Sequence, residues 1–294
     1  MEDALPSVGA ERSDVDTAIE PAPADELWPA LRQEAKALLD KEPGLFELFR
    51  RRVLDHDSLD AALAGHLSGR LSSPELTAHR LDEIFREAFA GDRSLGAAAQ
   101  ADLFAVKSRD PACKGYMAAL LNSSGFWALQ AHRVAHWLWT QERCYAALHL
   151  QGRLIETFGI DIHPAARIGA GILIDHGTAL VIGETAIVED GVSMLHEVTL
   201  GGTGKARGDR HPKVRRGVSI GAGAKILGNI EIGAHSRIGA GSVVLSPVAP
   251  FTTVVGVPAR VVARPIDGVA AAARLDDGDR ELALRPPAAT ARRA

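Results

Sequence analysis

Aliphatic residues recur every six positions along the C-terminal half of the chain. A six-residue unit suits one flat face of a triangular coil, made of a short strand, a turn and one inward aliphatic side chain. Three such faces complete one turn of a parallel β-helix, whose stacked aliphatic side chains form a continuous core. We therefore predict a parallel β-helix over residues 156–263. The aliphatic positions are Ile168 and Ile174, then, after a shift of two residues, Ile182, Val188, Met194 and Leu200, and finally Ile220, Ile226, Ile232, Ile238 and Val244.

The residues between Leu200 and Ile220 interrupt this pattern. The segment is rich in glycine and in charged residues, and we assign no aliphatic residue of the repeat to it. We predict that residues 201–217 form a loop that leaves the coil. Long loops in compact domains often carry function, so this loop is a candidate for ligand binding.

The N-terminal half has the apolar spacing of helices instead. One helix face is predicted by Leu81, Ile84, Phe85, Ala88 and Phe89. Upstream, Ser73-Pro74 is a helix start signal, because serine caps free N–H groups and proline fits the first turn. An apolar stretch rich in tryptophan follows at residues 126–139, and we interpret it as core packing and not as a ligand site. We predict a helical domain over residues 25–155.

The two ends of the chain lack both patterns. Residues 1–24 are acidic and rich in proline and alanine, and we expect disorder there because they bury too little apolar surface. Residues 264–294 lose the repeat and are expected to be a flexible tail. With no basic and apolar leader and no apolar run near the ~20 residues that span a bilayer, we expect a cytoplasmic protein that does not bind membranes.

Composition narrows the functional classes. The 294 residues include 29 glycines and only 5% aromatic residues, which favours a fold built on tight turns. The net charge of −4 argues against a nucleic-acid-binding protein, which needs a broad basic surface. Cys113 and Cys144 form no CxxC and have no metal-ligand spacing. We interpret them as buried thiols, with a disulfide between them as the alternative.

Several runs of residues are more specific than a generic repeat, and they make the chain resemble the serine acetyltransferase family. The resemblance covers roughly residues 25–263. The narrowest matches are Asp161-Ile162-His163-Pro164-Ala165-Ala166, Asp175-His176-Gly177-Thr178, and Thr199–Lys205 leading to Gly208-Asp209-Arg210-His211-Pro212-Lys213. Supporting matches are Gly183–Ala186, Gly221–Lys225, Gly256–Arg260, Arg109–Ala112 and Gly125–Arg133.

The resemblance implies an α+β protein with a helical N-terminal domain followed by a left-handed parallel β-helix. It also implies acetyl transfer from acetyl-CoA to the hydroxyl group of L-serine, which gives O-acetylserine in the first step of cysteine biosynthesis. Members form trimers with active sites between subunits, and their helical domains contribute to the serine site and pair two trimers into a hexamer. Acetyl-CoA is a co-substrate, and neither a permanently bound cofactor nor a metal is expected.

This reaction needs a base for the serine proton, because a neutral alcohol is a poor nucleophile. By resemblance, His176 is that base and Asp161 lies behind it, fixing the tautomer of the ring and stabilising the imidazolium. On its chemistry alone, His176 is equally well read as a structural histidine, since the chain has 11 of them.

The zwitterionic substrate needs partners of both charges. By resemblance, Asp110 and Asp175 receive the ammonium group, while Arg210 and His211 bind the carboxylate. Glu184 supports the same site. The structural alternatives are a helix end for Asp110, a solvated basic loop for Arg210 and His211, and a corner of the repeat for Glu184.

The resemblance also places CoA along the β-helix between neighbouring subunits. Basic side chains there attract its phosphates, and small residues let the chain approach the pantetheine closely. The residues assigned to CoA are Gly202, Lys205, Ala222, Lys225 and Arg260.

Two departures from the family pattern stand out. The family has a second glycine where this chain has Ala179, which adds one methyl group near the serine pocket. Many members end in an isoleucine that enters the next enzyme of cysteine synthesis, whereas this chain ends in Ala291-Arg292-Arg293-Ala294. A complex with that cysteine synthase is therefore not favoured. Cysteine is expected as a feedback inhibitor, because it resembles serine.

Three other functions stay open. An acetyltransferase for a sugar or another amino acid would share the fold and the base, and only the pocket residues distinguish it. A zinc carbonic anhydrase on the same fold would need three histidines converging between subunits. The candidates for that role are His163, His176, His196, His211 and His235. A non-catalytic scaffold for a partner enzyme would not need both His176 and Asp161.

Overall fold

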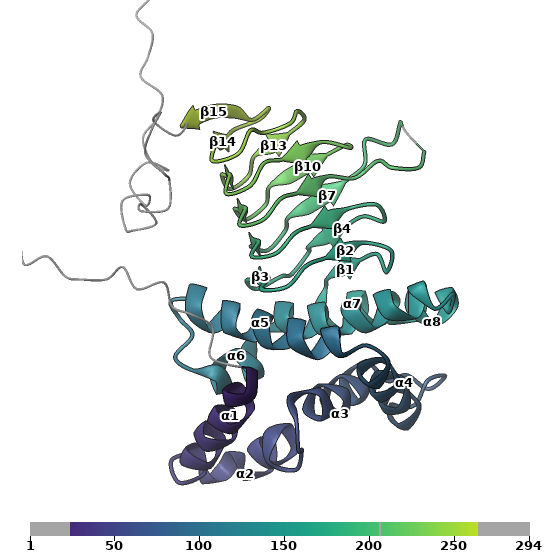
Figure 1. Cartoon of the computed structure of the whole chain (residues 1–294), viewed down its shortest axis with the longest axis vertical. Helices are drawn as coiled ribbons and strands as arrows, with labels where there is room; N and C mark the ends of the chain where they lie inside the picture. The colour runs from purple at the N-terminus through teal and green to yellow at the C-terminus, as the bar shows by residue number, and fades with distance from the viewer. Residues whose placement is uncertain (1–23, 206, 264–294) are drawn as a thin grey trace, which may run out of the picture.

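The computed structural model describes residues 24–205 and 207–263. The two tails expected at 1–24 and 264–294 lie outside these residues, apart from Ala24. Helices form the lower part of the molecule in Figure 1 and strands the upper part. The α-helices are α1 (Ala24–Leu39), α2 (Phe46–Phe49), α3 (Leu59–Leu71), α4 (Ala78–Gly91), α5 (Arg93–Arg109), α6 (Tyr116–Asn122), α7 (Ser124–Thr140) and α8 (Cys144–Phe158). A 3₁₀ turn, η1 (Pro43–Leu45), and a π-helical turn, η2 (Arg50–Leu54), flank α2.

Helix α4 carries the predicted apolar face, with Leu81, Phe85, Ala88 and Phe89 buried. The start signal placed at Ser73-Pro74 is wrong. The Ser73 hydroxyl accepts a hydrogen bond from the Leu76 N–H, which closes a separate turn. The helix begins only at Ala78, where the hydroxyl of Thr77 accepts from the Arg80 N–H.

The tryptophan-rich stretch forms α7, and its interpretation as core is confirmed. Phe126, Trp127 and Leu129 are buried, while Trp137 and Trp139 are half-buried against the same core. Cys113 and Cys144 are free and half-buried, so the disulfide alternative is wrong.

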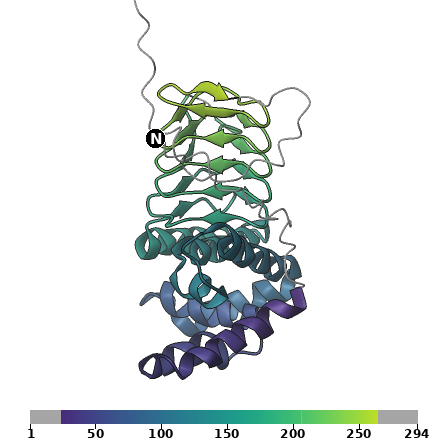
Figure 2. The same cartoon turned by 90° about the vertical axis from the view of Figure 1, so that its left-hand side faces the viewer.

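Three sheets of very short strands form the sides of a triangular coil, which confirms the β-helix. Figure 2 shows the successive coils stacked above the helices. Sheet A joins β1 (Asp161–Ile162), β4 (Val181–Ile182), β7 (Thr199–Gly201), β10 (Lys225–Leu227) and β13 (Val243–Val244). Sheet B joins β2 (Arg167–Ile168), β5 (Ile187–Val188), β8 (Lys213–Val214) and β11 (Glu231–Ile232). Sheet C joins β3 (Leu173–Ile174), β6 (Ser193–Met194), β9 (Ser219–Ile220), β12 (Arg237–Ile238), β14 (Thr253–Val255) and the antiparallel β15 (Arg260–Ala263).

The register of these sheets stacks the repeat residues on one another. In sheet A, Ile182 pairs with Leu200, which pairs with Ile226, which pairs with Val244. All four side chains are buried. The one aliphatic position of the repeat that is only half-buried is Ile168, in the first coil.

The excursion between β7 and β8 is shorter than the predicted loop of residues 201–217. Val214 is fully buried and pairs with Val188, so β8 belongs to the coil. Val214 lies six residues before Ile220 and therefore continues the repeat. The connection that leaves the coil spans only residues 202–212.

The shift of two residues between Ile174 and Ile182 has a structural cause. Turns from sheet C to sheet A normally span four residues, as in 195–198, 221–224 and 239–242, but the first one spans six, 175–180. This long turn accommodates three left-handed residues: His176 (φ 57°), Gly177 (φ 76°) and Ala179 (φ 60°). The additional residues lie outside the strands and leave the stacking of the strands intact.

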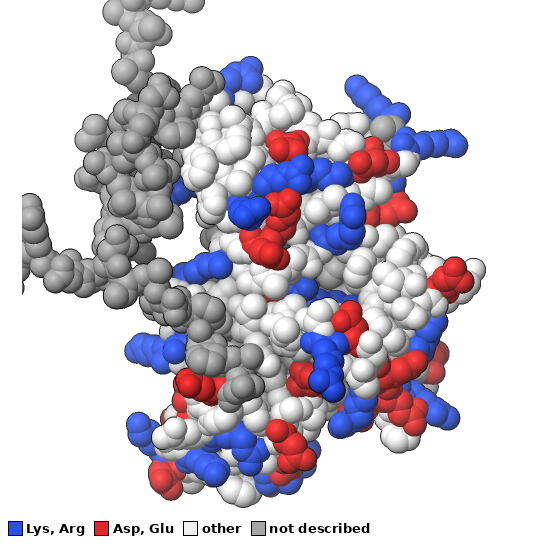
Figure 3. All heavy atoms as spheres, in the orientation of Figure 1, with Lys and Arg blue, Asp and Glu red and all other residues white. Residues whose placement is uncertain are grey.

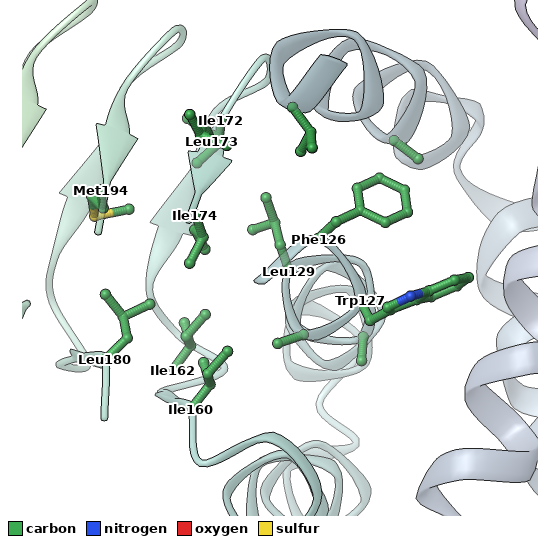
Figure 4. Close-up of a cluster of buried hydrophobic side chains, with 14 of the residues drawn as sticks. Phe126, Trp127, Leu129, Ile160, Ile162, Ile172, Leu173, Ile174, Leu180 and Met194 are labelled. Carbon is green, nitrogen blue, oxygen red and sulfur yellow. The ribbon is translucent and has the colours of Figure 1, made fainter. Parts of the chain in front are cut away.

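Helix α7 packs directly on the first coil. A Cβ atom at Gly125 would lie 2.1 Å from the carbonyl oxygen of Ile174, so only glycine allows this approach. Figure 4 shows side chains of α7, including Leu129, beside those of Ile172 and Ile174.

A buried ion pair also holds α5 and α7 against the first coil of the β-helix. The carboxylate of Asp102, on α5, is fully buried and accepts hydrogen bonds from Arg133 (2.7 and 3.1 Å), Gln130 (2.9 Å) and the Ile172 N–H (2.9 Å). Arg133, on α7, also donates to the carbonyl oxygens of Ile168 (3.1 Å) and Gly169 (2.6 Å). Burial raises the pKa of Asp102, and the Arg133 charge opposes this shift.

Removing one partner of this pair should destabilise the folded protein, because the other charge is then left buried without a partner. We expect Asp102→Ala to lower the free energy of unfolding by about 3–5 kcal/mol, measured by denaturant titration. The matched control is Asp82→Ala, which removes the exposed pair with Arg86 and should cost at most about 1 kcal/mol. Equal losses in the two variants would contradict a special role for Asp102.

Candidate active site

Five of the seven predicted catalytic and substrate-binding residues lie on two different edges of the triangular β-helix. We call the turns that run from sheet C to sheet A the C/A edge, and those from sheet A to sheet B the A/B edge. Asp175 and His176 lie on the C/A edge, in the long first turn. Glu184, Arg210 and His211 lie on the A/B edge. Within one chain, sheet A separates the two groups.

His176 is well exposed at the C/A edge. Its side chain is 72% exposed, and its Nε2 lies 3.8 Å from a carboxylate oxygen of Asp175. The ring stacks edge-on against His196 of the next coil, with a centroid separation of 5.8 Å. An exposed imidazole beside a carboxylate is suited to accept a proton from a bound ligand.

Asp161 does not contact His176 in the described chain. Its side chain points outward from β1, and its carboxylate accepts a hydrogen bond of 2.6 Å from Gln151 on α8. Among the described residues, Asp175 is the only acidic residue within 4 Å of His176. The expected pairing of Asp161 with His176 is not formed within the described chain, where the ring packs against His196.

Asp110 and Asp175, predicted to share one ligand group, line a common groove. The groove runs along sheet C, from the end of α5 to β14 and β15. Asp110 follows α5, and its carboxylate accepts from the Ala112 N–H at 2.8 Å. The preceding residue, Arg109, donates to the Gly191 carbonyl oxygen (3.0 Å) and to the Ser193 hydroxyl (3.2 Å), which fixes Asp110 against the β-helix.

His211 is buried at the A/B edge, in a seat formed by neighbouring backbone. Its Nδ1 accepts a hydrogen bond from the Thr185 N–H at 3.1 Å. A Cβ atom at Gly183 would lie 2.1 Å from Nε2 of His211, so the ring occupies the space of the missing side chain. Burial lowers the pKa of His211, and the neighbouring Arg210 charge lowers it further. Both effects favour the neutral form of the ring.

Arg210 pairs with Glu184 at a distance of 2.6 Å. This hydrogen bond is the main reason that the pKa of Glu184 is lowered. A second guanidinium N–H of Arg210 donates to the Gly208 carbonyl oxygen at 3.0 Å. Two of its five N–H groups are used in these contacts, and the others suit an anionic ligand.

His163, predicted only as a candidate zinc ligand, lies at the A/B edge beside Glu184, Arg210 and His211. We call these four residues and the turns that carry them the A/B cluster. Nδ1 of His163 accepts from the Ala165 N–H at 3.1 Å, and its ring stacks edge-on against Trp139. Burial lowers its pKa, while the charges of Glu184 and Asp161 oppose this shift. The signal available in the sequence was its place in the run of residues 161–166.

The residues assigned to CoA are spread over the β-helix. Gly202 begins the excursion, close to Arg210 and His211, and Lys205 is exposed within it. Ala222 lies on the C/A edge two coils above His176. Lys225, on β10, donates to the Glu197 carbonyl oxygen, and Arg260, on β15, is exposed. The described chain does not gather these five residues into one place.

The charges on the surface alternate in sign. Figure 3 shows acidic and basic side chains side by side over the β-helix on the face in view. One such cluster is Arg215 with Glu189 (2.7 Å) and Glu231 (2.5 Å). Such mixed clusters are unlike the broad basic surface that binds nucleic acids. None of the described helices is long and apolar enough to cross a membrane.

Comparisons with known proteins point to one family. The family profile "Serine acetyltransferase, N-terminal" matches residues 27–131, and "Bacterial transferase hexapeptide (six repeats)" matches residues 211–246. The serine acetyltransferase of Escherichia coli K12 is 53% identical over 239 residues, which cover 81% of this chain and 88% of that protein.

Two solved structures are similar over most of their length. Soybean serine acetyltransferase complexed with serine has a TM-score of 0.80 and 52% identity, covering 82% of this chain and 100% of that one. The Brucella abortus serine acetyltransferase in complex with coenzyme A has a TM-score of 0.80 and 46% identity, covering 83% and 99%. The left-handed turn of the β-helix agrees with these structures.

The seat of His211 gives a prediction about its protonation. We expect His211 to titrate below the ordinary histidine pKa of 6.5, followed by NMR of the ring signals. Gly183→Ala should push the ring outward and move its pKa up toward 6.5, because burial is the main cause of the shift. Gly152→Ala is the control, since a Cβ there meets nothing within 4 Å. An unchanged His211 pKa in Gly183→Ala would show that Gly183 does not form the seat.

Proposed function

This chain belongs to the serine acetyltransferase family, which transfers an acetyl group from acetyl-CoA to L-serine, and we propose how its own residues perform that transfer. The observation that carries the proposal is His176, an exposed imidazole in the long turn, beside Asp175 and the groove that Asp110 also lines. A base for the hydroxyl and two carboxylates for the ammonium group thus come from neighbouring positions.

His176 acts as the general base. Its neutral ring takes the proton of the serine hydroxyl while the oxygen attacks the carbonyl carbon of the thioester. The resulting tetrahedral oxyanion collapses, the carbon–sulfur bond breaks, and the imidazolium returns the proton to the CoA thiolate. The products are O-acetylserine and CoA, and no other reactant is needed.

Serine is held at its two charged ends. Asp110 and Asp175 bind the ammonium group, and Arg210 and His211 bind the carboxylate, with Glu184 holding the guanidinium of Arg210. The charged groups of an α-amino acid are only a few ångströms apart. The two binding groups, however, lie on either side of sheet A in the same chain. Asp110 and Asp175 line the groove along sheet C, whereas Arg210 and His211 lie on the A/B edge.

A complete site therefore takes the C/A edge of one chain and the A/B edge of another. Three chains arranged around a threefold axis would form three such sites, and the helical domains would then pair two trimers into a hexamer. CoA would lie in the same cleft, near Gly202, Lys205, Ala222, Lys225 and Arg260.

Cysteine is proposed as an inhibitor that competes with serine. It carries the same ammonium and carboxylate groups and differs only by sulfur in place of the hydroxyl oxygen, so it fits the same charged partners.

The role of His176 is tested by thiol release from acetyl-CoA with L-serine as acceptor. We expect His176→Ala to lower kcat by about 10²–10⁴-fold, the usual contribution of a positioned base. His79→Ala, which removes an exposed histidine of α4, should leave kcat unchanged. Near-normal activity of His176→Ala would exclude it as the base, and faster release with a sugar than with serine would exclude the acceptor.

The same assay assigns the carboxylate that orients His176. If Asp161 does so in the working complex, its second carboxylate oxygen can accept from the imidazole while the first keeps Gln151, and Asp161→Asn will lower kcat while the KM for serine changes little. A kcat unaffected by Asp161→Asn would assign the orienting role to Asp175, which lies 3.8 Å from the ring.

Mixing two impaired variants tests whether the site is shared, provided that activity is measured at a serine concentration far below KM, where each variant alone is nearly inactive. His176→Ala and His211→Asn each damage one edge, and a trimer reassembled from equal amounts of both has intact sites only where two undamaged edges meet. We expect recovery of about one quarter of the wild-type activity, because each edge at a site is intact in half of the chains. No recovery after verified reassembly would show that each site is built from a single chain.

A further inference from the structure

Thr185 lies at the centre of the A/B cluster. It follows Glu184 in the turn between β4 and β5, and the end of the excursion that carries Arg210 and His211 folds over it. Its hydroxyl oxygen accepts hydrogen bonds from the N–H groups of Arg210 (3.0 Å) and His211 (3.1 Å). Its carbonyl oxygen accepts from the ammonium group of Lys213 at 2.9 Å. Thr185 thus holds two of the last three residues of the excursion and the first residue of β8.

The backbone of Thr185 also determines the tautomer of His211. The Thr185 N–H points at Nδ1 of the ring from 3.1 Å, and a backbone N–H can only donate. Nδ1 must therefore carry a lone pair, and in the neutral ring the proton resides on Nε2. Nε2 faces Gly183 and Gly202, two residues without side chains. Nε2 makes no hydrogen bond to the described residues, so the N–H of the ring is left as a donor for an anion.

The hydroxyl of Thr185 has its bonding capacity filled. A hydroxyl accepts two hydrogen bonds and donates one. Both acceptor positions are taken by the N–H groups of the loop. The proton is directed to the Asp209 carboxylate, because the lone pair of His211 Nδ1 already accepts from the Thr185 N–H. Valine has the shape of threonine without the hydroxyl, so it would leave two N–H groups of the loop without partners.

We propose that Thr185 is a positioning residue for substrate binding: it holds Arg210 and His211 as a pair of N–H donors for the carboxylate of the amino acid. The proposal rests on the proposed function, in which that pair binds the carboxylate. Thr185 itself does not touch the substrate. Its hydroxyl places the backbone of the loop, and its amide sets the direction of the His211 donor.

The other charged groups around His211 agree with this arrangement. Glu184 accepts a hydrogen bond from one N–H group of the Arg210 guanidinium. Lys213 uses its three donors on the carbonyl oxygens of Thr185 and His211 and on the Asp209 carboxylate (2.9, 2.8 and 2.5 Å), so it braces the loop and does not compete for the substrate. His163 holds its Nδ1 as an acceptor in the same way, through the Ala165 N–H.

The test compares Thr185→Val with Thr185→Ser in steady-state kinetics. We expect Thr185→Val to raise the KM for L-serine about tenfold or more, with the KM for acetyl-CoA and kcat changed less than about twofold, because two hydrogen bonds that place the carboxylate donors are lost. Thr185→Ser keeps the hydroxyl and should restore a nearly normal KM for L-serine. Thr140→Val, which removes a hydroxyl bonded within α7, should change neither KM.

Two further measurements separate this proposal from its premise. ¹⁵N NMR of His211 should show the proton on Nε2 in wild type and in Thr185→Ser. His211→Asn should raise the KM for L-serine whether or not Thr185 acts as proposed. If His211→Asn has no effect on that KM, the proposed carboxylate site itself is wrong. If it has the expected effect but Thr185→Val does not, or if Thr185→Val changes both KM values and kcat alike, only the role of Thr185 is overturned.

Discussion

The ion pair between Asp102 and Arg133 fixes how the two parts of the chain meet. It joins α5 to α7, and both residues also bond the backbone of the first coil. A buried charge tolerates little displacement, because any separation leaves it without compensation. The end of α5, which carries Asp110, is therefore held at a set place relative to the turn that carries Asp175. Two carboxylates that are 65 residues apart can then line one groove only as long as this junction is rigid.

Most of the β-helix could be predicted because its repeat is both a sequence pattern and a packing pattern. Each inward aliphatic residue stacks on the one in the next coil, so a missing member would leave a cavity. Val214 was overlooked because it follows a polar excursion, although it lies in phase with Ile220. Ser73-Pro74 shows a different limit: several residues near a helix start can act as caps, and only the fold selects Thr77.

The site was predictable as a set of residues but not as an arrangement. The runs of residues around Asp161, His176 and Arg210 identify the family, yet their separation on two edges depends on the order of the sheets. The bond between Asp161 and Gln151 comes from the packing of α8 beside β1, which no local pattern records. No role in the transfer could be assigned to His163 or Thr185 from the sequence. The ring of His163 is oriented by a backbone N–H group, that of Ala165. Thr185 acts through its own N–H group, which donates to His211, and through its hydroxyl, which accepts from the loop backbone. A sequence does not reveal where those groups point.

The long turn at 175–180 has a consequence for how such a protein can vary. Its two additional residues lie outside the strands, so the coils above and below keep their register. The turn that carries His176 and the stack of coils are thus structurally independent of each other. Lengthening the stack by whole coils beyond β13 would add height and stability without moving His176, since the first coil is anchored to the helices from below. Evolution can accordingly change the reach of the β-helix and the chemistry of its first turn independently.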